Sequence, residues 1–306
     1  MGEDAVVFDS VVKTYGAVQA LRGATFRVPK GAIASLVGPN GAGKTTTLRI
    51  CAGLLRRDYG VVRVFGADPW EDPEEVRTRI GYLPESPSLP KVSVETLLIH
   101  AAMVKGVDDP VREAMRVTRL AGLQGILGRK AAKLSAGWRQ RLALAISLIG
   151  EPELLIMDEP AANLDPSNRM RLYDLIRSLC NDLGVSALIS THILTEAQQY
   201  SNYMIVISEG MIVAEGYTNE LSKRVSSLVK ARFRGRSEAS VREAARDVLS
   251  MGGVRGVSVE GQYLVVTVEP DAYDEVKKAL LSAGLKLVEE GAADLTDIYR
   301  KVVKEG

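Results

Sequence analysis

The sequence predicts an α/β fold followed by a small α+β domain, because the pattern of apolar residues changes twice along the chain. Strand-like and helical runs alternate up to about residue 84 and return after residue 150, which indicates a mixed core. Between them, residues 93–149 lose the strand pattern and carry helical spacing. These changes predict an N-terminal domain at 1–221 with a helical subdomain at about 85–150, and a C-terminal domain at 222–306.

The N-terminal domain is expected to contain short strands and a helix that follows the third of them. A helix is predicted at Thr45–Leu55, because Leu48, Ala52 and Leu55 recur on one face. Short apolar runs bounded by polar or turn residues predict buried strands. These strands are expected at Ala5–Phe8, Ala24–Val28, Ile33–Val37, Leu154–Met157 and Ser186–Ser190.

The C-terminal domain is expected to be ferredoxin-like, because its runs follow the order β-α-β-β-α-β and end in a further helix. Gly261 is placed in the turn of a predicted hairpin. The strands are expected at Leu228–Phe233, Val254–Val259, Tyr263–Val268 and Leu285–Val288, and the helices at Ala239–Ser250, Ala272–Leu281 and Leu295–Val303. This order of elements by itself carries no information about function.

Composition excludes several classes of protein. The 306 residues carry a net charge of +1, which disfavours a general nucleic-acid binder. Two cysteines and two histidines make a zinc cluster improbable. The best apolar run, Leu142–Ile149, is far shorter than the ~18 residues that a membrane span needs. The acidic N-terminus lacks the pattern of a signal peptide, so a cytoplasmic location is expected.

A phosphate-binding loop follows the predicted strand Ile33–Val37. The run Gly38-Pro39-Asn40-Gly41-Ala42-Gly43-Lys44-Thr45 matches the Walker A pattern in full and opens a helix, which predicts a P-loop NTPase core. Glycines let the backbone approach phosphates closely, and the amides at the helix start then point at the anion. We expect these residues and Thr46 to bind ATP, with Lys44 at the β- and γ-phosphates and Thr45 on Mg²⁺.

Two carboxylates follow the predicted strand Leu154–Met157. Asp158 ends this apolar run, in the pattern of a Walker B strand, and Glu159 comes next. Ligands gather at the carboxyl ends of parallel strands, which would place both carboxylates beside the phosphate loop. We therefore expect Asp158 to hold Mg²⁺ and Glu159 to act as general base toward the attacking water.

Leu134-Ser135-Ala136-Gly137-Trp138 precedes an apolar helix, and here the sequence resembles the ABC ATPase family, whose signature is Leu-Ser-Gly-Gly-Gln. The resemblance implies that Ser135 and Gly137 contact the γ-phosphate of ATP held by a partner subunit. Ala136 replaces a glycine, and Trp138 replaces glutamine, which removes a polar contact and adds an aromatic surface.

Further landmarks of that family occur in the expected order. The resemblance implies that Tyr15 stacks on adenine, that the loop Leu164-Asp165-Pro166 crosses a dimer interface, and that His192 senses the γ-phosphate. Ala161-Ala162-Asn163 lacks the usual hydroxyl residues before that loop. Glu85 stands where the family has a glutamine, and its carboxylate would offer an oxygen to the metal.

The resemblance covers about residues 4–220 and implies an ATP-hydrolysing subunit that drives a separate transmembrane permease. It implies a head-to-tail homodimer or heterodimer on the inner face of the cell membrane, without a nucleic-acid partner. The residue Glu85 and the C-terminal domain favour an exporter. The alternative is a soluble ABC ATPase that acts on ribosomes or DNA. The C-terminal domain would bind a regulatory ligand, stabilise the dimer, or serve only as a structural appendage.

Overall fold

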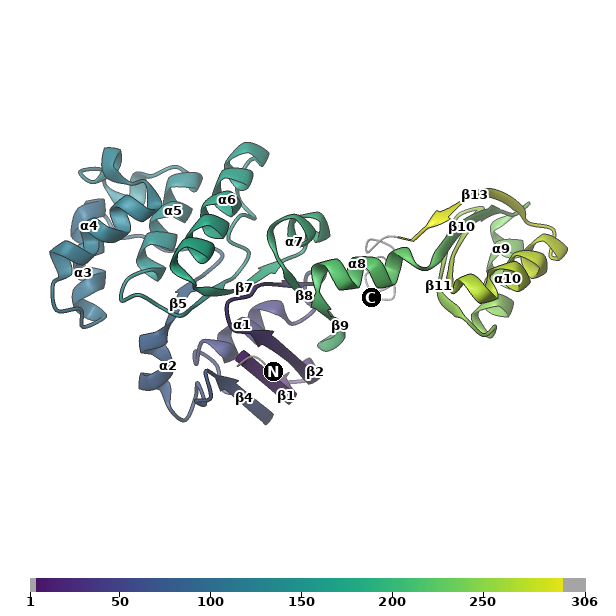
Figure 1. Cartoon of the computed structure of the whole chain (residues 1–306), viewed down its shortest axis with the longest axis horizontal. Coiled ribbons are helices and arrows are strands. Elements are labelled where there is room, and N and C mark those ends of the chain that lie inside the picture. The colour runs from purple at the N-terminus through teal and green to yellow at the C-terminus, as the bar shows by residue number, and fades with distance from the viewer. Residues whose placement is uncertain (1–3, 294–306) are drawn as a thin grey trace. The chain divides into compact units, whose positions relative to one another are not determined.

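The computed structural model describes residues 4–293, apart from the side chains of residues 224 and 226. The chain forms two compact units, and the boundary between them lies between Glu215 and Gly216, shortly before the predicted boundary at 221/222 (Figure 1). The predicted helix Leu295–Val303 lies outside the described residues.

The first unit contains two sheets. The larger has six strands in the order β5-β6-β7-β3-β8-β9, and β5, β6, β7, β3 and β8 pair in parallel. The smaller is antiparallel, with three strands in the order β2-β1-β4. The strands are β1 (Asp4–Tyr15), β2 (Val18–Pro29), β3 (Ile33–Val37), β4 (Tyr59–Val64), β5 (Ile80–Leu83), β6 (Leu154–Met157), β7 (Ser186–Thr191), β8 (Tyr203–Ser208) and β9 (Met211–Tyr217).

Helices cover both faces of the larger sheet. One helix, α1 (Lys44–Cys51), packs between the two sheets, because its buried Leu48 and Ile50 share a core with residues of both. The helices α3 (Val94–Val104), α4 (Pro110–Ala121), α5 (Ala136–Ser147) and α6 (Pro166–Leu183) form a second core on the other side (Figure 1). The unit also contains α2 (Pro73–Arg79) and α7 (Leu194–Tyr200).

Local sequence explains where several of these helices begin. Ser93 caps α3 by accepting a hydrogen bond from the Thr96 amide. Asp109 and Asp165 cap α4 and α6 in the same way, and a proline follows each of them at the first helical position. A cap satisfies amides that have no partner in the first turn, and proline has no amide to satisfy.

The predicted carboxyl end of the helix Thr45–Leu55 is wrong. The helix ends at Cys51, and Gly53 turns the chain with a φ of 64°. A β-carbon at Gly53 would lie 2.2 Å from the Pro69 carbonyl oxygen, so this close approach requires glycine. After the turn, Leu55 still packs against the core, although it is no longer helical.

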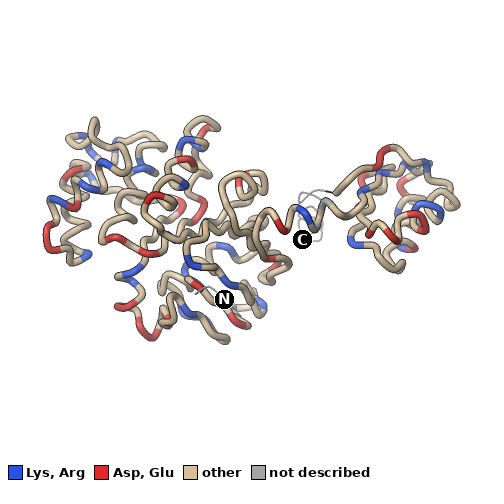
Figure 2. Tube along the Cα trace, in the orientation of Figure 1, with Lys and Arg blue, Asp and Glu red and all other residues tan. Residues whose placement is uncertain are grey.

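The second unit has the order β10 (Val229–Arg234), α9 (Glu238–Leu249), β11 (Val254–Glu260), β12 (Tyr263–Val268), α10 (Pro270–Ser282) and β13 (Lys286–Ala292). Its four strands pair antiparallel in the order β11-β12-β10-β13, and α9 and α10 share one core with them. The short helix α8 (Thr218–Ser226) precedes β10. Acidic and basic residues are interspersed along the chain in both units (Figure 2).

Candidate active site

The phosphate loop connects β3 with α1. All residues of β3 are buried, and α1 begins at Lys44, so the loop lies at the carboxyl end of a central strand. Gly43 has a φ of 105°, and a β-carbon there would lie 2.6 Å from the Ala20 carbonyl oxygen. At Gly38 a β-carbon would lie 2.3 Å from the Ile207 carbonyl oxygen. The loop therefore packs so closely on its neighbours that glycine is required at both positions.

Lys44 turns back across its own loop. Its ammonium group donates hydrogen bonds to the carbonyl oxygens of Gly38 at 2.8 Å and Pro39 at 3.0 Å. The same Nζ lies 3.2 Å from Oε1 of Glu159. Because Lys44 is 7% exposed, this cation is held in a partly desolvated position at the mouth of the loop.

Asp158 lies beside the first residues of α1. In the parallel sheet, Met157 pairs with Ile189, so Asp158, the first residue after β6, lies beside Ser190, near the end of β7. Oδ1 of the buried Asp158 accepts hydrogen bonds from the hydroxyl of Ser190 at 2.8 Å and from that of Thr45 at 3.2 Å. A carboxylate and a hydroxyl at this spacing are the hard oxygen ligands that Mg²⁺ prefers, so these residues fit the ion.

Glu159 is the most constrained residue of the site. Its backbone has a φ of 44°, in the left-handed region, which costs a non-glycine residue about 1–3 kcal/mol. Its amide donates to the Ser190 hydroxyl at 2.8 Å, which holds this conformation. Its carboxylate has two partners, Lys44 at Oε1 and Nδ1 of His192 at 2.7 Å from Oε2. The carboxylate is therefore oriented from both sides, by the first residue of α1 and by the residue that follows β7.

Tyr15, Ser135 and Gly137 lie at the surface, apart from this cluster. Tyr15 ends β1 with 47% of its surface exposed, and the Lys13 ammonium lies 5.6 Å from its ring centroid. Ser135 precedes α5 and makes no capping hydrogen bond, and Gly137 lies in the first turn of that helix. Within residues 4–293, no hydrogen bond or ion pair joins Tyr15 or Ser135 to Lys44, Asp158 or Glu159.

Glu85 is exposed, and among the described residues its carboxylate makes no hydrogen bond or ion pair with Thr45 or Asp158. Its backbone oxygen instead accepts a hydrogen bond from Nε2 of the Gln140 side chain at 2.9 Å. Gln140 lies on α5 and is buried, so the signature helix is tied to the loop after β5. The structure thus gives Glu85 a place near the signature helix but adds no support for its predicted contact with the metal.

Sequence reasoning missed the role of Ser190, which bridges the carboxylate of Asp158 and the amide of Glu159. A polar residue near the end of an otherwise apolar strand was the available signal, because such residues need a hydrogen-bond partner when buried. Tyr82 was also missed. Burial raises the pKa of its phenol, and the nearby Asp158 carboxylate raises it further, so the phenol stays protonated beside the site.

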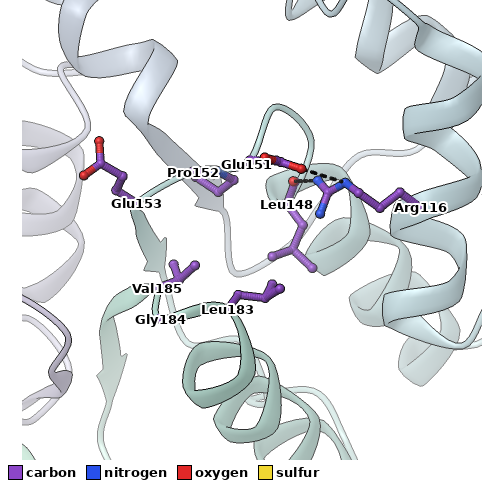
Figure 3. Close-up of a pocket in the computed structure, with 8 residues that line it drawn as sticks. All are labelled: Arg116, Leu148, Glu151, Pro152, Glu153, Leu183, Gly184 and Val185. Atoms are coloured by element: carbon purple, nitrogen blue, oxygen red, sulfur yellow. Dashed lines mark hydrogen bonds and ion pairs between the residues drawn. The ribbon is translucent and has the colours of Figure 1, made fainter.

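A separate pocket of about 300 Å³ lies at the other end of the sheet (Figure 3). Glu153 and Val185 line it directly before β6 and β7, together with Leu183 and Arg116. None of the predicted site residues lines this pocket, so it is distinct from the cluster around Glu159.

Comparisons with known proteins show the family to which the chain belongs. The ABC transporter family model matches residues 21–162. The chain is 36% identical over 245 residues to the daunorubicin/doxorubicin resistance ATP-binding protein DrrA of Streptomyces peucetius, over 79% of this chain and 74% of that protein. It is 34% identical over 299 residues to the daunorubicin resistance ATP-binding protein DrrA3 of Streptomyces coeruleorubidus, over 94% of this chain and 91% of that protein.

A solved ATP-binding cassette of an ABC transporter, in its ADP conformation, matches with a TM-score of 0.64 at 27% identity, over 72% of this chain and 94% of that chain. These matches confirm the predicted α/β fold with a P-loop NTPase core and the predicted resemblance. No helix among the described residues is long and apolar enough to span a membrane. The chain therefore belongs to the ABC transporter family, as one of its ATP-binding, ATP-hydrolysing subunits.

Proposed function

We propose that this subunit binds ATP with Mg²⁺ at the carboxyl ends of β3, β6 and β7, and that Glu159 is the general base of hydrolysis. The observation that carries the proposal is the position of the Glu159 carboxylate between Lys44, at 3.2 Å, and His192, at 2.7 Å. A carboxylate oriented on both sides can accept a proton from water in a defined direction, a role that contributes about 10²- to 10⁴-fold in rate.

The other site residues bind the phosphates, the metal ion and the adenine ring. The amides of the phosphate loop and the start of α1 bind the phosphates, and Lys44 and His192 stabilise the negative charge that develops on them. Glu159 orients the attacking water and takes up its proton. Thr45 and Asp158 would hold Mg²⁺, which neutralises charge on the β- and γ-phosphates when bound. Tyr15 stacks on the adenine ring.

We further propose that two subunits close head to tail over two ATP molecules, as a homodimer or a heterodimer. Ser135 is exposed, and its hydroxyl is not used in capping α5, so hydroxyl and helix amides are free to meet a phosphate of the partner. The start of a helix favours an anion through its unpaired amides and its dipole. At Gly137 the atoms nearest to the position of its absent β-carbon belong to Asn168, at 3.5 Å, and a glycine here adds no side chain to obstruct this approach.

We propose that the dimer drives a separate transmembrane permease from the inner face of the membrane, in the direction of export. The names of several relatives support export: resistance to daunorubicin in Streptomyces peucetius, and Nod factor export in Paraburkholderia xenovorans, whose protein is 36% identical over 230 residues. We also propose that the second unit is a ferredoxin-like domain, which its strand order β11-β12-β10-β13 supports.

The variant Glu159→Gln tests the catalytic proposal. It keeps the shape of the side chain but cannot accept a proton from water, so we expect phosphate release to fall by about 10²-fold or more. ATP affinity, measured by titration with a fluorescent analogue, should stay within about threefold, because the phosphate loop is unchanged. Wild-type turnover in this variant would contradict the assignment of Glu159.

Purification of the tagged subunit from membranes in mild detergent tests the permease proposal. We expect a protein with several membrane spans to co-purify, and mass spectrometry would identify it. Recovery of ribosomal or DNA-repair proteins with no membrane partner would instead support the soluble alternative. The variant Lys44→Ala serves as a control, because loss of nucleotide binding should leave docking to a permease intact.

A further inference from the structure

The carboxylate of Glu196, which has little access to water, contacts the residue that precedes His192. Oε2 of Glu196, on α7, accepts hydrogen bonds from the hydroxyls of Thr191 and Tyr173, each at 2.9 Å. Its Oε1 lies 3.2 Å from the Arg169 guanidinium. The Glu196 side chain is 11% exposed, so it joins β7 and α6 with little access to water. Thr191 is the residue immediately before His192.

The third partner of Glu196, Arg169, connects it to another loop. Arg169 lies in the first turns of α6, and its guanidinium also donates to the Leu164 carbonyl oxygen at 3.4 Å. Leu164 belongs to the loop Leu164-Asp165-Pro166, which the proposed dimer places at its interface. One carboxylate therefore contacts, on one side, the segment that carries His192 and, through Arg169, the loop that reaches toward the other subunit.

The hydroxyl of Thr191 makes a second hydrogen bond. It accepts a hydrogen bond from the Ile193 amide at 3.0 Å, so the backbone is held on both sides of His192. His192 itself is bonded to Glu159. A change at Glu196 would reach the general base through Thr191 and His192 without touching ATP.

Placing Glu196 in this cluster costs free energy of desolvation, which a contact between apolar residues would avoid. Burying a carboxylate is unfavourable unless it is paired and hydrogen-bonded. Burial raises the pKa of Tyr173, and the adjacent Glu196 raises it further, so this phenol remains a donor to Glu196. The ring of Tyr173 stacks on Tyr200 at 4.8 Å, which fixes its orientation. An apolar residue at position 196 would pack α7 on α6 without these demands.

We infer that Glu196 is a positioning residue for ATP hydrolysis, which sets the pose of His192 and ties it to the loop at Leu164. The inference rests on the proposed roles of Glu159 and His192. It predicts a loss of turnover without loss of ATP affinity, because Glu196 lies behind the site and Lys44 and the phosphate loop are untouched. Small displacements of catalytic groups cost large factors in rate.

The test compares Glu196→Gln with Glu113→Gln. Glu113 is a matched control, because it is equally buried, is bonded to Arg116, and has no link to His192. We expect Glu196→Gln to lower kcat by about tenfold or more while the Kd for ATP stays within about threefold. Glu113→Gln should leave kcat unchanged even where the melting temperature falls. Thr191→Val replaces the hydroxyl by a methyl group, which removes its bonds to Glu196 and to the Ile193 amide, and it should lower kcat at least as much as Glu196→Gln.

A double-mutant cycle separates positioning from packing. If Glu196 acts through His192, the effect of Glu196→Gln should largely disappear in a His192→Ala background, since coupled residues are not additive. Equal effects in both backgrounds, an unchanged kcat, or parallel losses of kcat and affinity would each overturn the inference. Glu159→Gln is measured alongside: if it is inactive while Glu196→Gln is fully active, the proposed function stands and this inference fails.

Discussion

Two glutamates with little exposure to solvent, at opposite ends of the larger sheet, show how differently one fold uses a carboxylate. Glu113 lies near the amino ends of β6 and β7, and Glu159 lies at the carboxyl end of β6; their side chains are 9% and 12% exposed. Arg116, on the same helix as Glu113, satisfies both of its oxygens at 2.7 Å. The partners of Glu159 come instead from two other elements: Lys44 is the first residue of α1, and His192 directly follows β7.

The backbone sharpens this contrast. Glu113 sits in the regular helix α4, and the Gly150 amide adds a further hydrogen bond to its Oε1 at 2.8 Å. Glu159 adopts a φ of 44° and is held there by Ser190. A relaxed, fully paired carboxylate stabilises the fold, whereas a strained one with exchangeable partners is typical of a catalytic site. The pocket lined by Arg116 lies at the same end of the sheet as Glu113, away from Glu159 (Figure 3).

Among the variants that test this comparison between Glu113 and Glu159, Ser190→Ala is expected to have the largest effect, a loss of turnover. Without the hydroxyl, the amide of Glu159 and Oδ1 of Asp158 each lose a partner, and an unpaired buried group costs about 1–3 kcal/mol. If the loss raises the activation free energy of hydrolysis by the lower part of this range, turnover drops roughly tenfold. Steady-state phosphate release measures this. Ser190→Thr, which keeps a hydroxyl, is the control, and full turnover in Ser190→Ala would show that Glu159 needs no such support.

A smaller effect, on stability and not on turnover, is expected at the other end of the sheet. Glu113→Gln replaces charge-assisted hydrogen bonds by neutral ones and leaves Arg116 without its main counter-charge. We expect the free energy of unfolding to fall by about 1–3 kcal/mol. Urea denaturation followed by circular dichroism would measure this difference. A loss of ATPase activity without a loss of stability would break the comparison between the two glutamates.

The smallest effect concerns pH. Hydrogen bonds from Arg116, and then from the Gly150 amide, lower the pKa of Glu113 in the folded protein below its ordinary value of 4.5. Its contribution to stability is therefore complete above pH 4.5 and is lost as pH falls through the lowered folded value. The stability difference between wild type and Glu113→Gln should shrink in acid. A difference that grows below that pH would show that the ion pair does not lower this pKa.

Much of the candidate site could be predicted from short sequence motifs whose physical reason is known. The phosphate loop needs glycines between a buried strand and a helix, and β3, the loop and α1 have this order. Asp158 and Glu159 directly follow a continuous apolar strand. Local patterns predicted the structure less well where it depends on contacts between residues far apart in the sequence. The strand β8 was not predicted although all of its residues are buried, and Gly53 ends α1 early because of its contact with Pro69.

By itself, the sequence determined which chemical groups the site contains, because each short motif carries its own local geometry. Only the tertiary structure decided which groups meet. His192 is 33 residues from Glu159 and Asp158 is 113 residues from Thr45, yet each pair is in hydrogen-bond contact. The physical reason is the parallel register of β3, β6 and β7, which brings the ends of distant strands to one edge. That register depends on long-range packing of two apolar cores, which no local pattern specifies.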